Sequence, residues 1–303
     1  MTAPTLVKAR RRRETAAGYT FLSPWLLGFF LLTAGPMVAS LYLSFTDYDL
    51  FSDPEWIGVE NYTKLFADER FRHSVTVTLG YVLLATPLKL AAALGVAVLL
   101  NGRRKGQGFY RSAFYAPSLI GASVSIAIVW KALFGTEGAV DEIGQFFGWN
   151  SGGWVGNPSL SMPMLVLLSV WQFGAPMVIF LAGLKQVPAE LHEAALVDGA
   201  SRARRFWSIT LPMISPVLFF NLILETIHAF QIFNSAYVIS GGNGSPAGST
   251  LFYTLYLYMR GFADLKMGYA SAMAWLLAIA VAVLTLIMFR SSKSWVHYGG
   301  DQS

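Results

Sequence analysis

The sequence predicts an all-α integral membrane protein with six transmembrane helices and both termini in the cytoplasm. Of its 303 residues, 54% are hydrophobic and only 13% are charged, whereas a typical soluble domain carries about 25% charged residues. Three long stretches contain no charged residue at all, namely residues 15–46, 143–184 and 267–289. A helix needs about 20 mostly apolar residues to cross a bilayer. These stretches are long enough for that, and they argue against a compact soluble core.

Six apolar segments are long enough to serve as spans. The apolar residues run continuously through them instead of alternating at every second position, which predicts helices. A basic cluster at residues 8–13 precedes the first segment, but the apolar run that follows exceeds a signal-peptide core of about 7–15 residues and lacks a small-residue cleavage site. We therefore expect a retained first span. The predicted spans cover residues 18–45, 75–100, 110–134, 161–183, 207–238 and 268–289, of which the fifth is longer than one crossing needs.

The charges of the loops predict the orientation of the chain. The loops on one side of the predicted spans carry 15 Lys and Arg residues, and those on the other side carry 6. By the positive-inside rule, the more basic side and both termini are cytoplasmic. The loop at 47–72, which has seven acidic residues, is then extracytoplasmic. The chain thus divides into a cytoplasmic basic segment (1–17), a six-helix membrane domain (18–290) with a cytoplasmic loop at about 185–212, and a cytoplasmic tail (291–303).

The cytoplasmic loop between the fourth and fifth spans reads LKQVPAELHEAALVDGASRARRFWSITLPMISP over residues 184–216. Pro188 precedes a good helix-forming stretch, and Gly199 tolerates the positive φ that ends a helix. Ser201 is suited to be the N-cap of a second helix. The sequence therefore predicts a short helix, a tight turn and another helix on the inner membrane surface. Periodicity alone favours an amphipathic connector whose arginines anchor it at lipid headgroups.

The residues of this loop resemble the EAA loop of ABC importer permeases, which forms coupling helices that dock on a cytoplasmic ATPase subunit. The resemblance implies that Glu193, Ala194, Ala195, Asp198, Gly199 and Ala200 couple this chain to such an ATPase and transmit a rigid-body movement to the spans. A local capping or intraloop pair is an equally good interpretation of Glu193 taken alone. The further matching residues are Phe206, Ile209, Leu211, Pro212 and Pro216.

Nearly the whole chain resembles permeases of the carbohydrate uptake class, which includes the maltose-type importers, and in particular the first of the two paired permeases. One departure is visible, because many relatives read Gly-Gly-Pro after the fifth span, whereas Gly241-Gly242 is followed here by Asn243-Gly244-Ser245-Pro246. That difference bears on the outer loop, and so on receptor contact or sugar choice. The similar passages are residues 21–50, 56–66, 101–117, 171–184 and 230–250.

The resemblance implies an ABC type I importer permease fold and a binding-protein-dependent, ATP-driven importer that moves a mono- or oligosaccharide into the cytoplasm by alternating access. It also implies a multi-pass protein of a bacterial or archaeal inner membrane. The implied partners are a second permease subunit, a cytoplasmic ATPase dimer that binds ATP and magnesium, an extracytoplasmic solute-binding protein, the sugar and membrane lipid, but no nucleic acid. Permeases for glycerol-3-phosphate or a related polyol phosphate share this architecture and stay an alternative. An ion-coupled secondary transporter using Lys89 and Glu225 is less favoured, because no inverted repeat is evident.

No motif in the chain supports catalysis of its own. The sequence has no GxxxxGK[ST] P-loop, no HExxH pair and no GxSxG. The absence of cysteine excludes disulfides, thiolate catalysis and cysteine-ligated metals. The four histidines (His73, His192, His228 and His297) are scattered, which makes a poor metal constellation. We therefore expect no enzymatic activity, no metal and no cofactor in this chain, with ATP hydrolysis in a separate subunit. An intramembrane enzyme is improbable for the same reasons.

Two ionisable side chains fall within the predicted spans, Lys89 in the second and Glu225 in the fifth. Such groups are costly in a bilayer and usually face a bundle interior or a cavity. For Lys89 we favour snorkelling, or pairing with a carboxylate of another subunit, over contact with a transported substrate.

The fifth predicted span is rich in polar side chains. On an ideal helix Asn221, Glu225 and His228 fall within about 60° of one another, whereas Asn234 lies on the far side, so a continuous stripe needs a tilted or broken helix. In the maltose-type family the sugar contacts lie about 10 to 14 residues before the double glycine, which implies His228 and Gln231. Interhelical hydrogen bonding is the alternative. The candidate substrate-binding residues are Gln172 of the fourth span, Glu225, His228, Gln231 and Asn234.

Overall fold

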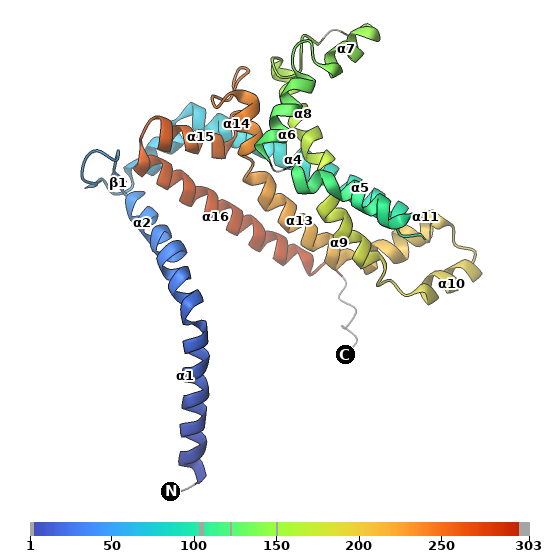
Figure 1. Ribbon diagram of the computed structural model, residues 1–303, viewed down its shortest axis with the longest axis horizontal. Helices are drawn as coiled ribbons and strands as arrows, with labels where there is room; N and C mark the ends of the chain where they lie inside the picture. Colours follow the sequence, from blue (N-terminus) through green and yellow to red (C-terminus); the bar gives the residue numbers. More distant parts are fainter. Residues whose placement is uncertain (1–2, 103–105, 122, 150, 297–303) are drawn as a thin grey trace. The chain divides into compact units, whose positions relative to one another are not determined.

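The computed structural model describes residues 3–102, 106–121, 123–149 and 151–296. The cations predicted at 103–105, the end of the predicted tail (297–303) with His297, and the first two residues lie outside this description. The described chain forms two compact units, Met1–Leu65 with Arg260–Trp275, and Phe66–Met259 with Leu276–Ser303. Figure 1 shows the helices in sequence colours.

The first unit begins with a long helix that contains the first predicted span. α1 (Ala3–Phe29) continues through a wider π turn (Phe30–Ala34) into α2 (Gly35–Leu43). Pro36 is the second residue after the π turn, and its ring lacks the N–H that a regular helix would donate there. The whole helix from Ala17 to Leu43 is long and apolar enough to cross a membrane.

A small hairpin follows this helix and was not predicted from the sequence. β1 (Thr46–Asp47) pairs antiparallel with β2 (Glu55–Trp56). Asn61, at the start of α3 (Glu60–Ala67), is buried and donates hydrogen bonds to the carbonyl oxygens of Ser44 and Thr46, at 3.0 and 2.9 Å. The unit is completed by the start of α16 (Met267–Ser292), where the indole of Trp275 donates to the Ser40 hydroxyl at 3.1 Å.

The second unit is a bundle of helices arranged around α4 (Glu69–Leu100), which Asp68 caps by accepting hydrogen bonds from the backbone N–H groups of Arg70 and Phe71. A π turn at Phe206–Thr210 joins two of its short helices. The other helices are α5 (Gln107–Ile120), α6 (Val124–Phe134), α7 (Ala139–Phe146), α8 (Pro158–Trp171), α9 (Gly174–Leu184), α10 (Ala189–Val197), α11 (Arg202–Arg205), α12 (Leu211–Met213), α13 (Ser215–Phe230), α14 (Asn234–Ser240), α15 (Tyr253–Tyr258) and the remainder of α16.

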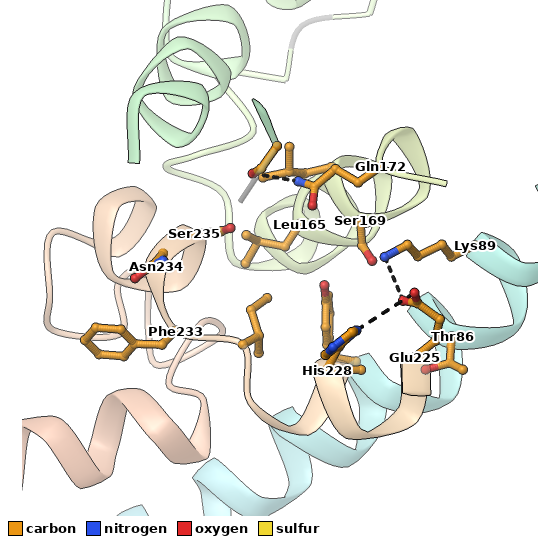
Figure 2. A pocket seen from close by; sticks show the side chains of 15 residues that line it. Thr86, Lys89, Leu165, Ser169, Gln172, Glu225, His228, Phe233, Asn234 and Ser235 are labelled. Carbon is orange, nitrogen blue, oxygen red and sulfur yellow. Dashed lines mark hydrogen bonds and ion pairs between the residues drawn. The ribbon is translucent and has the colours of Figure 1, made fainter. Parts of the chain in front are cut away.

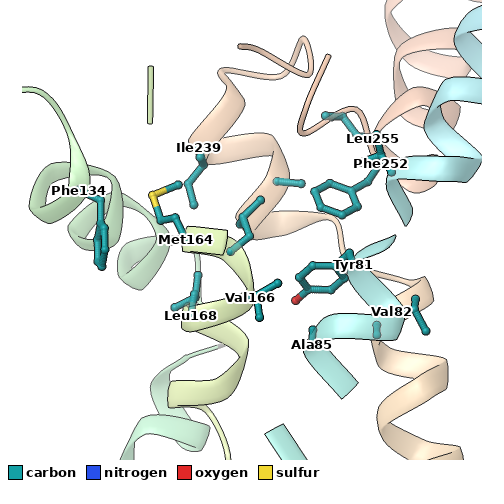
Figure 3. Packing of buried hydrophobic residues seen from close by; sticks show 14 residues of the cluster. Tyr81, Val82, Ala85, Phe134, Met164, Val166, Leu168, Ile239, Phe252 and Leu255 are labelled. Atoms are coloured by element: carbon teal, nitrogen blue, oxygen red, sulfur yellow. The ribbon is translucent and has the colours of Figure 1, made fainter. Parts of the chain in front are cut away.

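Two buried clusters form the core of this unit, and α4 contributes to both. The first cluster packs Tyr81 of α4 against Met164 of α8 and Phe252 (Figure 3). The second packs Ala93 of α4 against Phe180 of α9. Small residues on α4 allow the neighbouring helices to approach closely, as expected between helices in a membrane. α4 therefore organises the core along most of its length.

The predicted all-α membrane class is confirmed. Within the described residues, four helices are long and apolar enough to cross a membrane, or up to six if each of two bent helix pairs forms one span. The orientation of the termini stays a prediction.

The third and fourth predicted spans are each formed by a pair of bent helices rather than by one continuous helix. The third falls in the pair Gln107–Ile120 and Val124–Phe146, which is bent by 97°. The fourth bends by 44° between α8 and α9, and the reason lies in Pro176, which has no N–H for the carbonyl of Gln172 four residues earlier. The Ser118 hydroxyl of α5 donates to that carbonyl instead, at 2.9 Å.

The fifth predicted span began too early. Residues 206–213 form the π turn and the short α12, and the spanning helix starts only at Ser215. Pro212 and Pro216 account for the interruption, because neither ring can donate a helical hydrogen bond. The span is also broken near its end, where α13 stops at Phe230 and α14 starts at Asn234. The sequence indicated that the polar side chains of this span can form one continuous stripe only if the helix is tilted or broken. The structure contains such a break.

Candidate functional site

A polar pocket lies inside the second unit, between α4, the bend of α8 and α9, and the break of α13 and α14 (Figure 2). Its volume is about 190 Å³. Hydrogen-bonding side chains reach it from several spans that are otherwise apolar. The polar side chains that line it are Tyr81, Thr86, Lys89, Ser169, Gln172, Glu225, His228, Asn234 and Ser235.

An ion pair joins two spans at one wall of the pocket. The Lys89 Nζ of α4 lies 2.7 Å from Glu225 Oε2 of α13, and only 13% and 9% of the two side chains are exposed. Burial of a charge is tolerated when an opposite charge is within contact distance. The partner of Lys89 is therefore a carboxylate of its own chain, which corrects our expectation of snorkelling or of a carboxylate from another subunit. Lys89 lines the pocket that also contains four of the five candidate substrate residues, Gln172, Glu225, His228 and Asn234.

His228 is the most open of the candidate residues on α13. Its side chain is 66% exposed, and its Nδ1 lies 3.9 Å from Glu225 Oε1, which is beyond hydrogen-bond distance. The imidazole is thus largely exposed, with Nδ1 on the side of the Glu225 carboxylate. Neutral imidazole offers one donor and one acceptor, which suits a hydroxyl group.

The helix break brings Asn234 to the pocket but not Gln231. Gln231 caps the end of α13, is exposed, and is not among the residues that line the pocket. Asn234 begins α14 and lines the pocket together with Ser235. On an unbroken helix Gln231 continues the polar stripe and Asn234 lies on the far side. The break reverses this order, because it brings Asn234 to the pocket.

Gln172 lies at the bend between α8 and α9, and it lines the pocket. Its amide nitrogen donates to the Gly121 carbonyl at 3.0 Å. A Cβ on Gly121 would lie 2.4 Å from the Gln172 side chain, so only glycine leaves room for the amide. The hydrogen bond holds the Gln172 amide at the pocket wall (Figure 2).

Sequence reasoning missed four polar residues of the pocket: Tyr81, Thr86, Ser169 and Ser235. A signal was present for two of them. Thr86 lies three residues before Lys89, and Ser169 lies three residues before Gln172, so each polar pair shares one helix face. A polar pair at helical spacing in an apolar span marks the face that lines a cavity.

The predicted cytoplasmic loop forms a second exposed feature, here called the elbow, made of α10, the turn at Gly199 and α11. The predicted helix, turn and helix are confirmed. Gly199 has φ +76°, and the Ser201 hydroxyl caps α11 by accepting from the Arg204 N–H at 3.2 Å. An Arg205 Nη1 contact of 3.5 Å with the His192 carbonyl joins the two helices.

The elbow has no core of its own. Neither α10 nor α11 contains a buried residue, and Val197 is 89% exposed. Among the residues that the structure describes, Glu193 has no ion-pair partner and its side chain is exposed, so the intraloop pair that we considered for it is not formed. The small Ala194 and Ala200 and the turn at Gly199 leave this surface open. In Figure 1, α10 and α7 lie at opposite ends of the second unit.

Comparison with known proteins agrees with this architecture. Residues 74–294 match the family of binding-protein-dependent transport system inner membrane components. The chain is 50% identical over 299 residues to the probable ABC transporter permease protein YesP of Bacillus subtilis, covering 98% of this chain and 97% of that protein. It is 32% identical over 286 residues to the arabinooligosaccharides transport system permease protein AraP of the same species, covering 93% and 90%.

The fold is also similar to that of a solved membrane transporter. The chain aligns with a subunit of a bacterial alginate ABC transporter, crystallised in complex with an alginate pentasaccharide-bound periplasmic protein. The TM-score is 0.81 at 20% identity, over 94% of this chain and 96% of that subunit. The matched relatives are permease proteins and not ATPases. By its helical spans, its sequence and its fold, this chain belongs to the family of binding-protein-dependent transport system inner membrane components.

Proposed function

We propose that this chain is the permease subunit of an ATP-driven importer that moves a mono- or oligosaccharide into the cytoplasm by alternating access. The observation that carries the proposal is the polar pocket, where side chains from three spans converge within a helix bundle. The relative whose name specifies arabinooligosaccharides supports a saccharide as the substrate. Gln172, Glu225, His228 and Asn234 are the proposed contacts, and Gln231 rests on the family resemblance alone.

The elbow is the proposed docking site for the ATPase. A cytoplasmic ATPase dimer, which binds ATP and magnesium, docks on Glu193, Ala194, Ala195, Asp198, Gly199 and Ala200 of the exposed elbow. Closure of that dimer on ATP moves α10 and α11 as a rigid body and pulls on α9 and α13, to which the elbow is joined. A second permease subunit completes the passage, and a solute-binding protein delivers the sugar from outside.

The orientation can be tested directly because the chain contains no cysteine. Val197 in the elbow and Phe146 of α7 are both highly exposed, at 89% and 85%, and each is replaced by a single cysteine. In intact cells a membrane-impermeant maleimide is expected to label F146C and to spare V197C until the cells are opened. Labelling of V197C in intact cells would place the elbow outside and overturn the proposal.

Uptake by the assembled transporter tests the substrate. The chain is tagged, purified with its partner subunits and reconstituted into vesicles. The vesicles enclose ATP, and the labelled solute and the solute-binding protein are added outside. Glucose, maltose, arabinotriose and glycerol-3-phosphate are compared. ATP-dependent uptake of a sugar supports the proposal. Uptake of glycerol-3-phosphate alone indicates the polyol phosphate alternative, and ATP-free uptake driven by a proton gradient indicates a secondary transporter.

The contact between the elbow and the ATPase subunit is tested by crosslinking. A photoreactive crosslinker on a cysteine that replaces Ala194 or Ala200 is expected to capture the nucleotide-hydrolysing subunit in the intact assembly. The same crosslinker at Phe146 is the matched control, because this residue belongs to α7, which lies away from α10 in Figure 1. Equal capture from both sites, or none from the elbow, would contradict the coupling role.

A further inference from the structure

The wall of the pocket formed by α4 contains a hydroxyl group that the protein itself does not use. Thr86 is 4% exposed, it lines the pocket, and its Oγ1 has no hydrogen-bond partner among the residues that the structure describes. A buried polar atom without a partner costs free energy comparable to a lost hydrogen bond, so such atoms are rare in folded proteins.

Other threonines of the helix bundle show that a partner was available. Thr78 on the same helix donates to the Ser74 carbonyl at 2.8 Å, and Thr285 on α16 donates to the Val281 carbonyl at 2.7 Å. This bond to the carbonyl four residues earlier is the usual way in which a threonine hydroxyl is satisfied within a helix. The Thr86 hydroxyl does not make it, although it lies on the same helix as Thr78, directly before Pro87.

Thr86 shares its helix face with Lys89, three residues later, and the two lie on the same side of the pocket as Glu225 (Figure 2). The hydrogen-bonding capacity of this cluster exceeds what the cluster consumes. An ammonium group has three donors and an ionised carboxylate has about four acceptor sites. Within the described residues, one donor of Lys89 meets Glu225 Oε2 in the 2.7 Å pair, and Glu225 Oε1 lies 3.9 Å from His228 Nδ1.

We propose that Thr86, Lys89 and Glu225 form a polyol subsite that contacts the transported saccharide, a role that rests on the proposed function. Two neighbouring hydroxyl groups of a sugar ring donate to the Glu225 carboxylate and accept from the Lys89 ammonium. The Thr86 hydroxyl bonds a third position. The proton of each sugar hydroxyl stays on its oxygen, so the contact is binding without chemistry.

This assignment gives Lys89 a function that differs from subunit assembly. The ion pair holds the ammonium and the carboxylate side by side, which is the arrangement that a pair of adjacent hydroxyls can bridge. A purely structural pair would need no unpaired hydroxyl beside it, and an apolar residue at position 86 would serve it better.

The Thr86→Val variant tests the subsite in the assembled transporter, because it removes the hydroxyl and keeps the shape. The probe is the sugar of the uptake panel (glucose, maltose or arabinotriose) that the wild-type assembly imports fastest. The KM for uptake is expected to rise roughly three- to tenfold, as for the loss of one buried hydrogen bond. The apparent melting temperature of the assembly should be unchanged or higher, because an unpaired buried hydroxyl is replaced by a methyl group.

Two controls separate binding from packing. Thr86→Ser keeps the hydroxyl and loses the methyl, and its KM should stay near the wild-type value. Thr285→Val makes the same replacement on α16, away from the pocket, and should leave the KM unchanged. Equal KM values for wild type and Thr86→Val, or equal impairment of Thr86→Val and Thr86→Ser, would overturn the subsite.

Sugar-dependent thermal stabilisation provides a readout that does not require uptake. At high concentrations of glucose or maltose, the wild-type assembly should gain more melting temperature than the Thr86→Val assembly. If no sugar is imported, the proposed function fails. The difference in melting-temperature gain between the wild-type and Thr86→Val assemblies still tests whether the subsite binds a sugar. If both assemblies gain the same, the subsite is wrong even where uptake of a sugar is established.

Discussion

The pocket and the elbow are built in opposite ways. The pocket depends on contacts between segments far apart in the sequence, such as the pair of Lys89 and Glu225, which are 136 residues apart. The elbow depends on short-range bonds within residues 188–205, and it buries no side chain of its two helices. Substitutions that break a contact between two spans in the pocket should therefore act on the stability of the whole bundle, whereas substitutions in the elbow should act on the contact with a partner.

The largest effect is expected from breaking the ion pair. Lys89→Met leaves the Glu225 carboxylate buried without a counter-charge, which typically costs about 3–5 kcal/mol. The double variant Lys89→Met with Glu225→Gln removes both charges and should recover most of the stability. Thermal unfolding of the detergent-solubilised assembly measures both variants. A double variant as unstable as the single one would show that charge pairing is not what holds α4 to α13.

The next effect concerns the bend between α8 and α9. A Cβ on Gly174 would lie 2.6 Å from the Phe114 carbonyl oxygen and 2.7 Å from the Tyr115 Cα. Gly174→Ala should therefore force α5 and α9 apart at a cost of about 1–3 kcal/mol. Gly95→Ala is the control, because a Cβ there meets nothing within 4 Å, and alanine favours the helix. Equal melting temperatures for the two variants would show that the bend accommodates the methyl group.

A smaller effect on stability, but a specific one on coupling, is expected at the turn of the elbow. Gly199 has φ +76° and open space around its Cα, so Gly199→Ala strains the backbone by roughly 1–2 kcal/mol without a clash. Sugar-stimulated ATP hydrolysis by the assembly should fall while the melting temperature hardly changes. Gly152→Ala imposes the same strain at φ +63° in the loop after α7 and should leave ATP hydrolysis unaffected. An equal loss in both variants would remove the distinction between the regions.

The smallest effect is expected at the N-cap of α11. Ser201→Ala removes the bond from the Arg204 N–H and should loosen α11 by about 1 kcal/mol. Hydrogen exchange should become faster in residues 202–205 and stay unchanged in α13. Faster exchange along α13 as well would mean that the elbow and the span unfold together.

The elbow was predictable from the sequence because its determinants are local. Pro188, Gly199 and Ser201 each specify a helix boundary through their own backbone or side chain, and the structure places all three boundaries where the sequence puts them. The apolar segments were predictable for a similar reason, since hydropathy locates a span without reference to its neighbours.

The pocket was only partly predictable. Hydropathy made Lys89 and Glu225 conspicuous, but nothing in the sequence states that the two side chains meet. The interruptions of the helices determine which other residues line the pocket. The Gln172 carbonyl that Pro176 leaves free accepts its hydrogen bond from a hydroxyl of α5, and the interruption after Phe230 moved Asn234 to the pocket and left Gln231 off it. Such features follow from the packing of neighbouring helices, which a single sequence does not encode locally.

The interruption between α13 and α14 has a consequence for how this span sits in the bilayer. The Ile232 carbonyl within it accepts a hydrogen bond from the Thr254 hydroxyl. Peptide groups released from a helix cannot face acyl chains, because hydrocarbon offers them no partner. An unbroken apolar helix can turn about its long axis at little cost, but this one cannot. The interruption thus fixes the azimuth of the helix in the membrane through its main chain, whatever side chains lie on its outer face.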